Sequence, residues 1–197
     1  MGIIHPKVGE IDDHKIMTFI QTAKRNGWAS GREPDTRVED VDKFFYMDED
    51  FKYSDNFRGG KRFMGTELVS FKGEIIWGMN YYGKMIEIPE EARKSNETVN
   101  SFSRRSTRFL QSALMNCPEL LAFRGPIETH FALDRPDYGR FEYWNAVTGV
   151  TKDAAIWDFS GVEDVRFITN QSKMKWDLPK TQYHVFRTVY HGGIIIP

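Results

Sequence analysis

The sequence predicts an α+β fold, made of two helix-plus-antiparallel-meander repeats related by pseudo-twofold symmetry. Phenylalanine (15), tyrosine (8) and tryptophan (5) are plentiful, and they favour a sheet-rich fold with an aromatic core. A helix-like segment followed by strand-like segments occurs twice along the chain. The short, glycine-containing connections between the strand-like segments are of hairpin length, which implies antiparallel pairing.

The first helix is expected over residues 12–26. Its apolar residues recur at helical spacing, Asp12 or Asp13 precedes them as a candidate N-cap, and Gly27 follows as a candidate stop. Residues 29–42 are polar and turn-like. Strand-like text then runs from residue 43 to residue 86, as KFFYMDEDFKYSDNF, KRFMGTELVSF and EIIWGMNYYGKMI.

The second half follows a charged linker that ends near residue 100. An amphipathic helix is expected over about 101–116, because its apolar residues share one face and Pro118 ends it. Strand-like text resumes after it, as GPIETHFAL, GRFEYWNAV, AAIWDFSGVEDVRF and YHVFRTVYHGGIII.

An internal repeat relates the two halves. FMGTELVSF (63–71) matches FSGVEDVRF (159–167) at every second position, with an offset of 96 residues. The next strand continues the match at an offset of 109, so that Tyr81 aligns with Tyr190 and Gly83 with Gly192. We therefore expect one globular domain over residues 1–197, with repeat halves at 12–86 and 101–196.

Each copy carries a glutamate, Glu67 or Glu163, within an apolar stripe, because side chains alternate along a strand. Burial of an unpaired carboxylate costs several kcal/mol, so each should have partners or open into a pocket. Tyr81 and Tyr190 on the next strands are the expected hydrogen-bond donors, and Arg124 is a further candidate partner. In the simplest interpretation the two glutamates fix the sheets.

Two functional interpretations remain beside this structural one. The glutamates could act as a general acid and base, as in glycoside hydrolysis, or they could line a ligand site between the halves. The ligand site would use aromatic side chains that share one face of their strands. The candidate binding residues are Glu67, Trp77, Tyr81, Glu163, Phe186, Tyr190 and Arg124.

Other classes of function find little support in the sequence. A net charge of −1 argues against direct nucleic-acid binding, and no apolar run is long enough to span a membrane. The single cysteine, Cys117, excludes an internal disulfide, and we expect a bacterial, cytoplasmic protein. His184 and His191 are seven residues apart, which should point them to opposite faces of one strand, and no metal or cofactor is expected.

The motifs FRGGKRFMGTELV, IIWGMNYYG, AFRGP and VYHGGII together resemble a bacterial domain family of unknown function. Its members occur alone or behind a helix-turn-helix segment in transcriptional regulators, and the resemblance covers roughly residues 12–196. It implies a regulatory domain that binds a small molecule or a protein partner. A hydrolase and a structural or oligomerising module are the alternatives, the latter with a second copy as partner.

Overall fold

The computed structural model describes residues 2–88, 90, 97–116, 129–135, 139–148, 158–168 and 182–197. Cys117, Pro118 and Arg124 lie outside these ranges. The first half contains β1 (Gly2–His5), β2 (Gly9–Asp12), α1 (Asp13–Arg25), a short 3-10 helix (Trp28–Ser30), β3 (Thr36–Val38), β4 (Val41–Asp48), β5 (Phe51–Gly59), β6 (Arg62–Phe71) and β7 (Glu74–Met85). The second half contains α2 (Val99–Asn116), β8 (Thr129–Arg135), β9 (Gly139–Thr148), β10 (Asp158–Ile168) and β11 (Gln182–Ile194).

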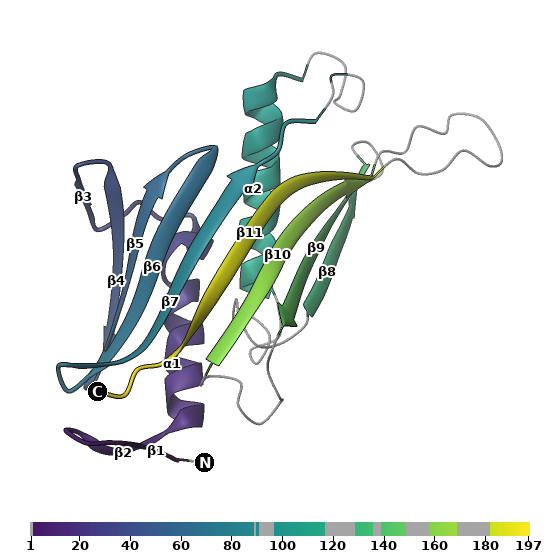
Figure 1. Ribbon diagram of the computed structural model, residues 1–197. Coiled ribbons are helices and arrows are strands. Elements are labelled where there is room, and N and C mark those ends of the chain that lie inside the picture. Colours follow the sequence, from purple (N-terminus) through teal and green to yellow (C-terminus); the bar gives the residue numbers. More distant parts are fainter. Residues whose placement is uncertain are drawn as a thin grey trace.

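The architecture is one curved antiparallel sheet with both helices on the same face (Figure 1). Its nine strands lie in the order β3-β4-β5-β6-β7-β11-β10-β9-β8, so the two meanders meet at β7 and β11. The α+β class predicted from the sequence is therefore confirmed. β1 and β2 form a separate hairpin.

The two helices form where their patterns predict them. The Asp12 side chain accepts a hydrogen bond from the backbone N–H of His14 at 2.9 Å, as an N-cap does. The buried faces of α1 and α2 contribute to one aromatic core between helices and sheet, including Phe19, Phe102 and Phe109. Neither helix of the described part of the chain has the length and apolar character needed to cross a membrane.

Some elements differ from the prediction. The segment that reads as one long strand from residue 43 is two strands, β4 and β5, because Glu49 turns the chain with a positive φ of 48°. The β1–β2 hairpin and β3 were not predicted, since four- and three-residue strands are too short to show a period.

The strand registers of the two halves agree position by position. Gly65 on β6 lies opposite Tyr81 on β7, and Gly161 on β10 lies opposite Tyr190 on β11. In the centre of the sheet, Tyr81 pairs with Tyr190. The residues that the sequence repeat aligns therefore occupy matching places in the two strand pairs.

A β-bulge also occurs at the same aligned place in each half. The extra residue is Ile76 in β7 and Val185 in β11, and both side chains are buried. A bulge shifts the alternation of side chains by one residue. As a result His184 and His191 are both on the exposed face, so their predicted placement on opposite faces is wrong. Among the described residues, no group of three or more His, Cys, Asp or Glu side chains is placed to hold a metal ion.

Candidate functional site: an aromatic cavity with a buried ionic cluster

The glycines of the repeat explain how the tyrosines reach across the sheet. A Cβ atom at Gly65 would lie 2.2 Å from Tyr81 Cζ, and one at Gly161 would lie 2.3 Å from Tyr190 Oη. Any side chain at these positions would collide with a rigid ring, so the ring lies directly over the glycine backbone. Each hydroxyl is thereby carried past β6 or β10 toward the next strand.

The tyrosine hydroxyls bind residues on that next strand rather than the glutamates that the sequence suggested as acceptors. Tyr81 donates to Asp55 Oδ1 at 2.8 Å, and Tyr190 donates to Asn145 Oδ1 at 2.6 Å. Each hydroxyl has one proton to donate, so the acceptor is Asp55 for Tyr81 and Asn145 for Tyr190. The expectation that these two tyrosines serve Glu67 and Glu163 is therefore wrong.

Glu67 has a different set of partners. Its Oε2 lies 2.7 Å from Lys24 Nζ of α1, and both side chains are largely buried, with 3% and 12% of their surface exposed. The Tyr53 hydroxyl also hydrogen-bonds Glu67. Burial, together with the negative charges of Glu67 and Asp55, raises the pKa of Tyr53 well above its ordinary value. Tyr53 therefore stays protonated and acts as a donor.

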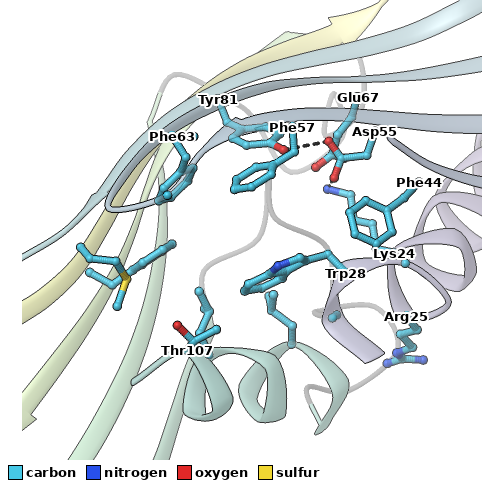
Figure 2. Close-up of a pocket in the computed structure, with 18 of the residues that line it drawn as sticks. Lys24, Arg25, Trp28, Phe44, Asp55, Phe57, Phe63, Glu67, Tyr81 and Thr107 are labelled. Carbon is cyan, nitrogen blue, oxygen red and sulfur yellow. Dashed lines mark hydrogen bonds and ion pairs between the residues drawn. The ribbon is translucent and has the colours of Figure 1, made fainter. Parts of the chain in front are cut away.

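Asp55 and Glu67 form the carboxylate pair of the site. They lie directly opposite each other in the β5–β6 register, and they are 9% and 2% exposed. Directly opposed like charges repel, so the arrangement requires compensation. Lys24 supplies a positive charge from α1 (Figure 2). We call Lys24, Tyr53, Asp55, Glu67 and Tyr81 the ionic cluster.

A cavity of about 270 Å³ opens beside the ionic cluster, between the sheet and the two helices; its sheet wall comes from the first half and from Phe186 of β11. All five residues of the cluster line it. Its remaining walls are mainly apolar, and the aromatic residues among them are Trp28, Phe44, Phe57, Phe63 and Phe186 (Figure 2). Apolar walls with a few convergent polar groups are the usual composition of a small-molecule site.

The structure separates the residues that the sequence proposed for one site. Glu67, Tyr81 and Phe186 line the cavity. Trp77 is fully buried and stacks on Phe159, with ring centroids 6.0 Å apart. Tyr190 lies over Gly161, outside the cavity as its described lining defines it.

Glu163 occupies the matching place in the second half of the sheet. It is fully buried and accepts a hydrogen bond from Tyr143 at 2.9 Å. The registers place Glu67 in the same row of paired residues as Phe159: Glu67 pairs with Met79, Met79 with Gly192, and Gly192 with Phe159. Because β6 and β10 are three strands apart and Glu163 is four residues further along, the two glutamates are separated by about 14 Å across and about 13 Å along the sheet.

Lys24, Trp28, Tyr53 and Asp55 were not predicted from the sequence. A signal for two of them is present, since FKYSD (51–55) and FEYWN (141–145) share phenylalanine at their first residue and tyrosine at their third, with an aspartate and an asparagine at their fifth. The match aligns Tyr53 with Tyr143 and Asp55 with Asn145. No comparable signal marks Lys24, because its contact depends on how α1 is rotated against the sheet.

Comparison with known families identifies the family of the chain. A family described as Domain of unknown function (DUF5680) matches residues 55–195. The chain belongs to this family. The matched segment begins at Asp55 and contains Glu67 and Tyr81, whereas α1 with Lys24 lies before it. No curated protein and no solved structure matches the chain.

Proposed function

We propose that this protein is a cytoplasmic regulatory domain of bacterial origin that binds a small molecule in its aromatic cavity. The observation that carries the proposal is the ionic cluster on the wall of that cavity. Buried charged groups reduce the stability of the folded protein unless they are compensated. Lys24, Asp55 and Glu67 all line the cavity, and apolar side chains in their place would pack the core at a lower cost in stability. A ligand with both apolar surface and polar atoms would match these walls.

The regulatory part of the proposal rests on the resemblance to domains fused with helix-turn-helix segments. A domain that binds a small molecule and has no chemistry of its own suits such a role. We further propose that residues 1–197 form one globular domain, derived by duplication of a half at 12–86 and 101–196 with pseudo-twofold symmetry. The matching registers and bulges support this proposal.

A hydrolase that uses Glu67 and Glu163 is the weaker alternative. The carboxyl groups of glycosidases are roughly 5 to 9.5 Å apart, because both must reach one bond. The separation of the two glutamates along and across the sheet is much larger than this. A carboxylate pair in this protein would instead be Asp55 and Glu67.

Binding can be tested by thermal denaturation with a library of small aromatic metabolites. A ligand at a hundred times its Kd adds about 2.7 kcal/mol of stability, which corresponds to a Tm increase of roughly 5 to 10 °C for a chain of this length. Thr107 on α2 lines the cavity, and Thr107→Phe would fill part of it. The shift should disappear in this variant and persist in Arg104→Phe, on the exposed side of the same helix.

If no compound in the library shifts the Tm of the unmodified protein, ligand binding at the cavity is refuted. A shift that persists in Thr107→Phe would place the binding site elsewhere.

A further inference from the structure

The two halves carry different side chains at one otherwise equivalent position. Asp55 on β5 lies opposite Glu67, and Asn145 on β9 lies opposite Glu163. Both residues accept a hydrogen bond from a tyrosine hydroxyl that has crossed a glycine. An asparagine therefore satisfies the tyrosine in this environment, and the negative charge of Asp55 is not needed for that hydrogen bond.

The charge of Asp55 is unfavourable for the folded sheet itself. It lies directly opposite a second buried carboxylate, and like charges at such positions repel. Asn145 avoids this repulsion in the second half. The half that has the carboxylate is also the half in which the position lines the cavity. This coincidence points to a role for the charge toward the contents of the cavity.

A count of formal charges gives the sign of that role. Asp55 and Glu67 contribute two negative charges to the ionic cluster and Lys24 contributes one positive charge, while Tyr53 stays protonated. Of the described residues that line the cavity, Arg25 is the remaining cation, and it lies away from the two carboxylates (Figure 2). The formal charges of the five described residues of the cluster therefore sum to −1, which favours a cationic ligand over an anionic one.

The other walls suit the same kind of ligand. The faces of aromatic rings attract cations. Phe44 and Phe57 lie on either side of Asp55, and Trp28 lies across the cavity from it (Figure 2). The volume of about 270 Å³ compares with roughly 150 Å³ for a cavity that takes up benzene. A molecule with one or two rings would fit.

We infer that the ligand is an aromatic amine, bound with its protonated nitrogen at Asp55 and its rings among the aromatic walls. This inference rests on the proposed function, because it specifies the ligand class of the same cavity. A charge-assisted hydrogen bond in a desolvated site is considerably stronger than a neutral one. An amine should therefore bind at least ten-fold more tightly than its uncharged analogue.

Titration calorimetry with three matched probes tests the inference: naphthylmethylamine, naphthylmethanol and naphthoate, which share one ring system and differ in charge. The unmodified protein should bind the amine most tightly and the acid most weakly. In Asp55→Asn, a substitution that copies Asn145, the preference of the amine over the alcohol should fall to less than three-fold. In Asp164→Asn, which removes a buried carboxylate that His184 contacts on the outer face, the preference should be unchanged.

The outcomes distinguish the ligand class from ligand binding itself. If the alcohol or the acid binds as tightly as the amine, the inferred class is wrong and the cavity is still a binding site. An unchanged preference in Asp55→Asn, with a cooperative thermal transition showing that the variant is folded, also overturns the inference. If none of the three probes binds, the aromatic-amine class is refuted, and the metabolite screen on the unmodified protein decides separately whether the cavity binds anything.

Discussion

Replacement of Glu67 tests whether the ionic cluster is a connected, buried unit. Glu67→Leu leaves the Lys24 ammonium without the carboxylate at 2.7 Å and leaves the Tyr53 hydroxyl without its acceptor. Removal of one partner from a buried ion pair costs about 3 to 5 kcal/mol. For a chain of this length, 1 kcal/mol corresponds to roughly 2 to 4 °C. The Tm should therefore fall by roughly 6 to 20 °C.

Glu67→Gln should be less harmful, because the glutamine carbonyl still accepts the Tyr53 hydrogen bond. We expect a loss of about 1 to 3 kcal/mol in the free energy of unfolding, measured by chemical denaturation. Adding Lys24→Met to Glu67→Leu should restore part of the stability, since the buried ammonium that lost its carboxylate at 2.7 Å is then removed as well. Glu74→Leu is the control, because Glu74 forms an exposed ion pair with Lys7 that contributes at most about 1 kcal/mol.

Equal stability of Glu67→Gln and Glu67→Leu would refute this reasoning, because it would mean that neither Lys24 nor Tyr53 depends on the carboxylate. A double variant no more stable than Glu67→Leu alone would show that Lys24 finds full compensation elsewhere. Either result would remove the physical basis for the ionic cluster.

Two further predictions concern the residues around the cluster. Gly65→Ala places a Cβ 2.2 Å from the Tyr81 ring, and we expect the free energy of unfolding to fall by about 1 to 3 kcal/mol. Gly60→Ala is the control and should have little effect, because its Cβ would meet nothing within 4 Å. Equal losses for the two variants in chemical denaturation would show that the ring is not held over Gly65. The raised pKa of Tyr53 predicts that stability falls as the pH rises above about 10, because the unfolded chain then ionises this hydroxyl while the folded chain does not. The decrease should be smaller in Tyr53→Phe, and identical slopes of unfolding free energy against pH in the two proteins would refute the assignment.

The sequence predicted the fold class and both helices because these depend on local periodicity and on connection length. It also identified Glu67 and Tyr81 as site residues, since both belong to the internal repeat of the sequence. The acceptor of Tyr81 was assigned wrongly because a tyrosine ring that lies over a glycine reaches one strand further than its neighbours. Such a reach depends on strand register, which the sequence does not specify by itself.

The cavity was harder to predict than the strands. Its lining combines the sheet with α1 and α2, and small rotations of a helix decide which side chain meets the sheet. Lys24 follows the buried Ala23 in α1, so its role could not be read from the apolar stripe alone. The bulge residue Val185 likewise changed the side on which His184 lies, and no glycine or proline marks it in the sequence.

The pairing of Tyr81 with Tyr190 has a consequence for how such a chain could have arisen. Nine residue pairs join β7 to β11, and the strands run antiparallel around these two aligned residues. Under the duplication proposed above, a single ancestral half would have carried one such strand at the open edge of its sheet. Because an antiparallel edge can pair with a copy of itself around a twofold axis, two identical halves could have associated as a homodimer before their genes were joined. Fusion would then have released each half to change on its own, which would account for an aspartate at residue 55 in one half and an asparagine at residue 145 in the other.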